Sequence, residues 1–76
     1  MIKYYTISNS VVRGHDVNIK KCFISRNDAI KYMLKYYRNR FINAEVLEEN
    51  DLKNHSIEYI CANNNRFTID RVKVEA

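Results

Sequence analysis

The 76-residue chain has a net charge of +4, with 46% hydrophobic and 29% charged residues. This length predicts a single domain (residues 1–76) with a small core, and the composition excludes an intrinsically disordered chain. No apolar run approaches the roughly 20 residues that a membrane-spanning helix needs, and residues 1–10 lack the apolar segment of a signal peptide. We therefore expect a cytoplasmic protein without membrane contact.

Charge is distributed unevenly along the chain. Residues 1–40 contain nine basic and two acidic side chains (+7), whereas residues 41–76 contain four basic and seven acidic ones (−3), and the sum is +4. This asymmetry indicates partners that are negatively charged on one side, either nucleic acid or an acidic protein.

The first 24 residues predict two strands. Residues 2–8 are rich in tyrosine and β-branched side chains, with Tyr5 and Ile7 on one face. Residues 9–16 contain the only glycine and predict a turn or loop. A second strand is expected over residues 17–24, where polar and apolar side chains alternate. The side chains that share one face there are Val17, Ile19, Lys21 and Phe23.

The stretch 25–41, SRNDAIKYMLKYYRNRF, predicts the only helix. At 100° per residue its apolar side chains fall on one arc, as in an amphipathic helix. These are Ala29, Ile30, Met33, Leu34, Tyr36, Tyr37 and Phe41. Ser25 and Asp28 are spaced to cap the N-terminus, and the helix is expected to end near Arg40.

Three strands are expected in the second half of the chain. Residues 42–49 alternate loosely, residues 48–55 are polar and turn-like, and residues 56–62 alternate clearly. Three asparagines at 63–65 predict a hairpin turn, because asparagine tolerates positive φ. In the fifth strand the apolar phase shifts at residues 70–71, which predicts a bulge or a break.

The predicted order is therefore β-β-α-β-β-β, which indicates an α+β fold. An antiparallel sheet of about five strands packed on one helix gives two layers, because hairpins need only short turns and the helix has a single apolar face to cover.

Sequence signatures of enzymes are missing. One glycine cannot build a phosphate-binding loop, and no CxxC, HExxH or GxSxG pattern occurs. The two histidines, His15 and His55, fall in predicted loops, and a catalytic pair with Cys22 or Cys61 would need a contact that the sequence does not specify. We expect a protein that is not an enzyme and uses no cofactor or catalytic residue.

The cysteines and the acidic segment also lack the patterns of a disulfide and of a metal site. Cys22 and Cys61 lie within predicted strands and are expected to be small buried hydrophobic residues rather than a disulfide. The cluster of Glu48, Glu49, Asp51 and His55 has no spacing typical of a metal-binding loop, so we expect no metal site.

The polar face of the predicted helix is basic. Lys31, Lys35 and Arg38 follow i, i+4, i+7 spacing, and Tyr32 and Tyr36 flank them at the border of the core. Cations beside tyrosines are typical of surfaces that bind single-stranded nucleic acid, although a solvated helix face is the ordinary alternative. The candidate partner-binding residues are Lys20, Lys21, Lys31, Tyr32, Lys35, Tyr36 and Arg38.

A second candidate surface is acidic. Its residues are Glu45, Glu48, Glu49 and Asp51. Such a patch is suited to a basic partner, for which it would mimic phosphates.

The chain resembles a class of small proteins in three stretches, YYTIS, NIKKCFISRNDAIKYML and SIEYICANNNRFTIDRV. In element order these look like phage-encoded inhibitors of host defence, including anti-CRISPR proteins whose sheet wraps one helix. The resemblance implies a stoichiometric inhibitor in the host bacterial cytoplasm that occludes a defence protein or ribonucleoprotein, for example a CRISPR–Cas effector. It assigns no functional residue.

Three functions follow as hypotheses. The first is this inhibitor, and the second is a small basic protein that binds RNA or DNA directly. The third is a self-associating structural module, in which residues 2–8 form an exposed edge strand that pairs across a two-fold axis to give a homodimer.

Overall fold

The computed structural model describes residues 2–11, 17–62 and 64–74. In chain order the elements are β1 (Ile2–Val11), β2 (Val17–Phe23), α1 (Arg26–Arg40), β3 (Val46–Asp51), the short 3₁₀ helix η1 (Lys53–His55), β4 (Ile57–Cys61) and β5 (Asn65–Val74). This order confirms the predicted α+β class and the sequence β-β-α-β-β-β.

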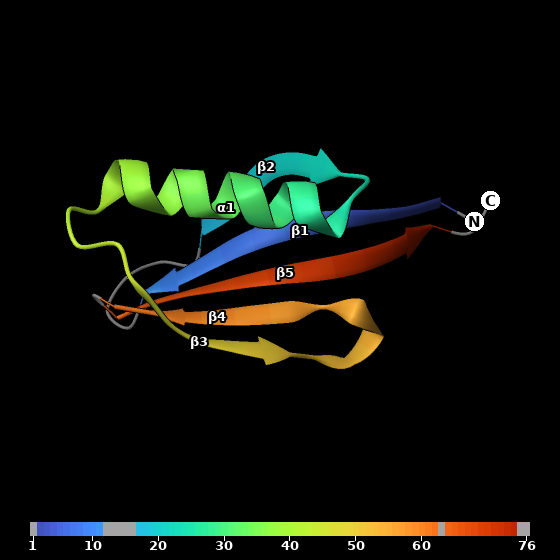
Figure 1. The fold of residues 1–76 in the computed structure, drawn as a ribbon. Helices are drawn as coiled ribbons and strands as arrows, with labels where there is room; N and C mark the ends of the chain where they lie inside the picture. Colours follow the sequence, from blue (N-terminus) through green and yellow to red (C-terminus); the bar gives the residue numbers. More distant parts are fainter. Residues whose placement is uncertain (1, 12–16, 63, 75–76) are drawn as a thin grey trace.

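The five strands form one antiparallel sheet in the order β2-β1-β5-β4-β3. Helix α1 lies across one face of the sheet, where it packs against β1, β5 and β2 (Figure 1). We call the opposite face of the sheet, which the helix does not cover, the open face. The molecule thus has two layers, with β2 at one edge of the sheet and β3 at the other.

The core lies between α1 and the sheet and follows the predicted alternation. Tyr5 and Ile7 of β1 are buried, and β4 shows strict alternation of buried and half-buried side chains. The buried apolar side chains are Tyr5, Ile7, Ala29, Met33, Tyr37, Ile57, Tyr59, Cys61, Phe67 and Ile69. Aromatic and β-branched residues therefore supply most of the apolar surface removed from water.

The helix begins and ends where the capping residues indicate. The Ser25 hydroxyl accepts a hydrogen bond from the Asp28 backbone N–H at 3.4 Å, and Asp28 meets the positive end of the helix. The last helical residue is Arg40, and the Phe41 N–H still donates to the Tyr37 carbonyl at 3.1 Å. No helix among the described residues is long and apolar enough to span a membrane.

The prediction for the first hairpin was wrong in two respects. Strand β1 continues to Val11 instead of ending at residue 8, because the Asn9 amide donates to Asn65 Oδ1 and to the Arg66 carbonyl, both at 3.2 Å. These hydrogen bonds place polar residues inside the sheet. Residues 12–16 of the predicted turn lie outside the described residues. Strand β1 also lies between β2 and β5 and is paired with both over residues 5–9, so it is not the edge strand that the self-association hypothesis uses.

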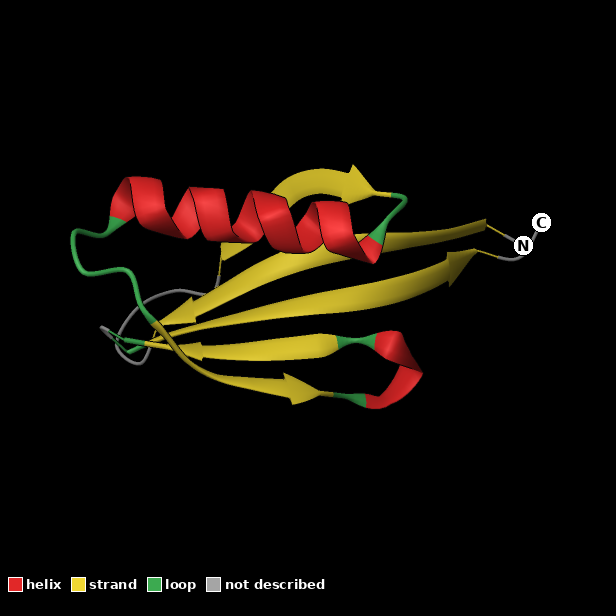
Figure 2. Ribbon diagram, in the orientation of Figure 1, coloured by secondary structure: helices red, strands yellow, loops and turns green. Residues whose placement is uncertain are grey.

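The third strand begins later and ends later than predicted. Residues 42–45 form a loop between α1 and β3 (Figure 2), in which the Glu45 N–H donates to the Tyr37 hydroxyl at 3.3 Å. A side chain thus takes the place of a strand partner for the Glu45 N–H, while the Glu45 carbonyl accepts a hydrogen bond from the Ala62 N–H at 2.9 Å. At the other end β3 reaches Asp51, because pairing with β4 outweighs the low strand propensity of Asn50 and Asp51.

The fifth strand contains no break at residues 70–71. Its pairing with β1 is continuous from Asn65 to Val74, and the register shifts lie instead in the β1–β2 and β3–β4 pairs. The change in apolar phase needs no bulge, because Val72 pairs with Tyr4 on the open face. In the predicted turn at residues 63–65, residue 63 lies outside the described residues, and Asn64 has the expected positive φ of 59°.

The two cysteines are free and differ in environment. Cys61 is buried, and burial raises the pKa of its thiol above the ordinary value. Cys22 is exposed, so its prediction as a buried residue was wrong. It lies in β2, an edge strand, where the face directed away from the helix has no covering layer.

Candidate functional site

A depression of about 340 Å³ lies between α1 and the edge strand β2. We call it the basic groove. Its lining residues are Lys21 from β2 and Tyr32, Lys35, Tyr36, Asn39 and Arg40 from α1. Segments separated by ten or more residues in sequence thus build one surface, on the side of the molecule where β2 borders the helix (Figure 1).

An irregularity in β2 accompanies the placement of Lys21. Phe23 pairs with Tyr5 and Ile19 pairs with Ile7, so that three residues of β2 stand opposite one residue of β1. Such a bulge bends a strand and redirects its side chains. The Lys21 side chain lies on the helix side, with its Nζ 4.7 Å from the centroid of the Tyr32 ring and 5.8 Å from that of Phe23.

A second cation occupies the next turn of the helix. The Arg40 guanidinium carbon lies 3.8 Å from the centroid of the Tyr36 ring. Both tyrosine rings are held from the core side as well: Tyr32 packs on Phe23 at 5.2 Å and Tyr36 contacts Phe67 edge-on at 6.2 Å. The rings therefore form fixed supports, and each carries a cation.

The groove has a positive potential. Lys21, Lys35 and Arg40 contribute three cations, and none of the described residues that line it is acidic. All three side chains are exposed, while the tyrosines are half-buried. Concave basic surfaces concentrate anions, because the low dielectric of the wall focuses the field. The groove is thus suited to a phosphate-bearing or carboxylate-bearing ligand.

The structure brings together four of the seven residues predicted for partner binding, namely Lys21, Tyr32, Lys35 and Tyr36. Lys31 and Arg38 are also exposed, but at 100° per residue they project from α1 away from the sheet, opposite its buried face. Lys20 is exposed and alternates with Lys21 along the strand. These three residues do not line the groove.

Two lining residues were missed from the sequence, Asn39 and Arg40. Arg40 was assigned only to the helix C-terminus, where it interacts with free carbonyls. Its i, i+4 spacing from Tyr36 is the feature that would have identified it, since side chains at this spacing meet on a helix surface.

The predicted acidic patch does not form one surface. Its four residues are exposed, but the register of β3 places Glu48 opposite Ile60 on the open face, and Glu49 and Asp51 opposite Tyr59 and Ile57 on the helix side. Asp51 is also engaged, because its Oδ1 accepts a hydrogen bond from the Arg26 guanidinium at 2.8 Å.

Two buried tyrosines, Tyr59 and Tyr37, have pKa values raised by their surroundings. Burial raises the pKa of Tyr59 above its ordinary value, the negative charges of Glu49 and Asp51 add to the rise, and Arg26 opposes it. Burial also raises the pKa of Tyr37, although hydrogen bonding to the Glu45 backbone works in the opposite direction.

Other chemistry-bearing side chains are scattered. Among the described residues, no group of three or more His, Cys, Asp and Glu side chains is placed to hold a metal ion. His55 has its ring 6.3 Å from that of Tyr5, and His15 lies outside the described residues.

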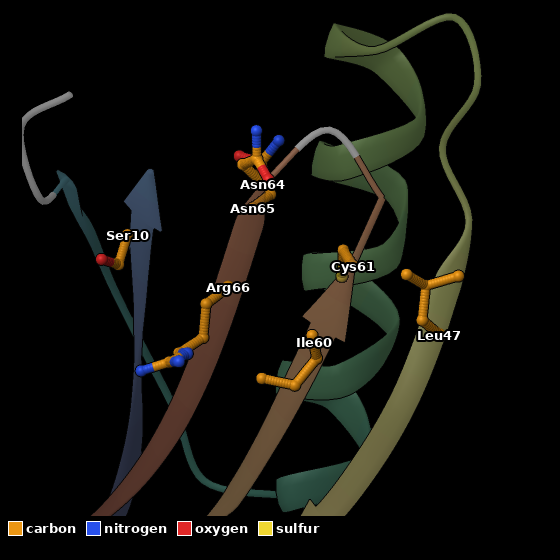
Figure 3. Close-up of a pocket in the computed structure, with 7 residues that line it drawn as sticks. All are labelled: Ser10, Leu47, Ile60, Cys61, Asn64, Asn65 and Arg66. Atoms are coloured by element: carbon orange, nitrogen blue, oxygen red, sulfur yellow. The ribbon is translucent and has the colours of Figure 1, made fainter. Parts of the chain in front are cut away.

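A second depression, of about 390 Å³, lies at one end of the open face (Figure 3). Arg66 is its one charged residue, and its Nε is 3.9 Å from a Glu58 oxygen. Ser10, Ile60 and Leu47 lie beside it on β1, β4 and β3. With one partly neutralised cation and mostly neutral walls, this surface is a weaker candidate than the basic groove.

No protein-family model, curated protein or solved structure matches this chain.

Proposed function

We propose that the protein is a non-enzymatic binding module that holds nucleic acid in the basic groove. The observation that supports the proposal is the convergence of Lys21, Lys35 and Arg40, from two elements, on one depression that also contains two tyrosines. Phosphate contacts from lysine and arginine supply most of the sequence-independent affinity of proteins for nucleic acids.

The first experiment measures the fluorescence anisotropy of labelled oligothymidylate of about 12 nucleotides, and of an RNA of equal length. We expect log affinity to fall linearly with log salt, with a slope of about −1.4 if two phosphates of a single strand are neutralised and about −2 if three are. Absence of binding at low salt, or binding that does not depend on salt, contradicts the proposal.

A charge-reversal variant tests the location of the site. Lys21→Glu combined with Lys35→Glu is expected to lower affinity about 100-fold, since each charge-assisted phosphate contact is worth roughly 1.5 kcal/mol. Lys53→Glu combined with Lys73→Glu is the matched control, because it reverses the same number of charges at exposed lysines outside the groove. Equal losses in the two proteins would remove the groove as the site.

A second candidate function is inhibition of a bacterial defence ribonucleoprotein in the host cytoplasm, as the sequence resemblance implies. The observation that favours it is charge separation, with the basic groove beside β2 and exposed Glu48, Glu49 and Asp51 on β3 at the opposite edge. A ribonucleoprotein offers phosphates for the basic groove and basic protein side chains for individual acidic residues at the β3 edge.

This candidate is tested by retention of a purified defence ribonucleoprotein, such as a CRISPR–Cas effector, on the immobilised protein at physiological salt. Retention with stoichiometric loss of the nuclease activity of the complex supports inhibition. If oligonucleotides bind but no complex is retained, direct nucleic-acid binding stands alone.

A further inference from the structure

The tyrosines of the basic groove are already covered by cations. Lys21 Nζ lies 4.7 Å above the Tyr32 ring, and the Arg40 guanidinium carbon lies 3.8 Å above the Tyr36 ring. A nucleobase that stacked on either ring from this side would have to displace the cation and lose the cation–π contact. The arrangement therefore favours contacts to phosphates over contacts to bases.

The helix sets the spacing of the two tyrosines that hold the cations. Tyr32 and Tyr36 are one turn apart, so their Cβ atoms are about 6 Å from each other, and each ring fixes one cation above it. Successive phosphates of one nucleic-acid strand have a comparable separation. Lys35, between the two tyrosines in sequence and exposed at the groove, adds a third cation.

The rings also reduce the entropic cost of binding. Free lysine and arginine side chains lose rotamer freedom when they contact a ligand, whereas these two are already held against aromatic faces. A guanidinium carbon 3.8 Å above a ring fits parallel stacking, which leaves the N–H donors at the guanidinium edge available to phosphate oxygens.

We propose that the basic groove binds two successive phosphates of a single strand, one at Lys21 and one at Arg40, and that Tyr32 and Tyr36 position these cations and do not stack on bases. This inference rests on the proposed nucleic-acid function and specifies its ligand as the sugar–phosphate backbone. Binding is accordingly independent of base sequence.

The test compares oligothymidylate with an abasic sugar–phosphate oligomer of the same length, by competition against the labelled strand. We expect the two affinities to agree within about threefold, since base stacking, if present, contributes roughly 5- to 150-fold per base. A loss of tenfold or more with the abasic strand overturns the inference while leaving the proposed function intact. If neither strand binds at low salt, the proposed function itself fails.

Variants of the two tyrosines supply a second readout. Tyr32→Phe and Tyr36→Phe keep the ring and are expected to retain affinity, whereas Tyr32→Leu and Tyr36→Leu should weaken both ligands equally, by about 3- to 10-fold. The ratio of the two affinities, measured on one sample, does not depend on the fraction of folded protein. If the leucine variants weaken only oligothymidylate, the rings stack on bases and the inference is wrong.

The salt dependence then counts the phosphates. Lys21→Ala and Arg40→Ala should each reduce the slope of log affinity against log salt by roughly 0.7 to 1, while Lys31→Ala, exposed on α1 but outside the groove, should leave it unchanged. Equal slopes for all three variants would overturn the assignment of phosphates to Lys21 and Arg40.

Discussion

The two edges of the sheet carry opposite charge, but they are built differently. At the β2 edge, helix α1 covers the strand, and three cations meet in one groove above aromatic rings. At the β3 edge, the acidic side chains are divided between the two faces, and Asp51 is paired with Arg26. Charge is therefore concentrated at one edge and dispersed at the other.

This difference shows that a binding surface needs convergence as well as charge. Helical spacing and a bulged strand bring Lys21, Lys35 and Arg40 together from positions that are far apart in sequence. Neighbouring acids on a strand diverge, because successive side chains point to opposite faces. Charged residues that are neighbours in sequence therefore point to opposite faces of a strand, whereas charged residues one turn apart share one face of a helix.

The largest effect is expected from Phe67, which supports both edges. It is fully buried and contacts both Tyr36 and Tyr37. Phe67→Ala should cost about 3–5 kcal/mol, which equals the whole stability of ~3–5 kcal/mol expected for a core of this size. Circular dichroism and urea titration should show a largely unfolded chain, whereas Val72→Ala, half-buried on the open face, should remain folded.

A smaller and more local effect is expected from Tyr37→Phe. The Tyr37 hydroxyl accepts the Glu45 N–H at 3.3 Å and lies 3.1 Å from the Ala62 carbonyl, so it joins the helix to the loop before β3 and to the end of β4. Its loss should cost about 1–2 kcal/mol in urea titration, because the partly buried backbone N–H of Glu45 loses its partner. Nucleic-acid affinity of the folded protein should be unchanged. If the free energy of binding changed more than the free energy of unfolding, Tyr37 at the β3 side would influence the groove at the β2 edge, contrary to this prediction.

Alkaline pH should destabilise the fold through groups near the acidic edge. Tyr59 has a pKa above its ordinary 10.0, so the folded chain keeps a proton that the unfolded chain releases. This contribution is complete below pH 10 and is lost as pH rises through the folded-state pKa. Urea titrations near pH 8 and pH 11 should show a smaller loss in Tyr59→Phe than in the natural protein, and equal losses would exclude Tyr59 as a source.

The smallest effect is expected from the exposed ion pair. The Asp51 side chain is 83% exposed, so Asp51→Asn should cost no more than about 1 kcal/mol, and the cost should vanish at high salt. Glu48→Gln, on the open face, is the control and should be neutral. A larger, salt-resistant cost for Asp51→Asn would mean that the acidic edge is as organised as the basic one.

Most of the fold was predictable because local patterns and tertiary packing agree. The capping pair of Ser25 and Asp28 marks the start of α1, and the alternation in residues 57–61 gives the buried face of β4. Polar segments were predicted less well. Asn9 and Asp51 lie in strands, since hydrogen bonding across the sheet overrides their preference for turns.

The candidate site was predictable only in part. The i, i+4 spacing of Tyr32 and Tyr36 is visible in the sequence, and both line the groove. The contact between Lys21 and Tyr32 depends on which face of β2 meets the helix, a tertiary property that alternation alone leaves undetermined. Arg40 was missed because a basic residue in the last turn of a helix is already accounted for by its interaction with the free carbonyl groups there.

The different environments of the two cysteines have a practical consequence for measuring ligand binding in the basic groove. The chain has only two thiols, and Cys61 is buried while Cys22 is exposed next to Lys21 in β2. A maleimide dye should consequently attach at Cys22 alone under native conditions, because the Cys61 thiol is both inaccessible and harder to ionise. A single fluorophore on β2, on the opposite face of the strand from Lys21, would then report ligand binding without any engineered residue.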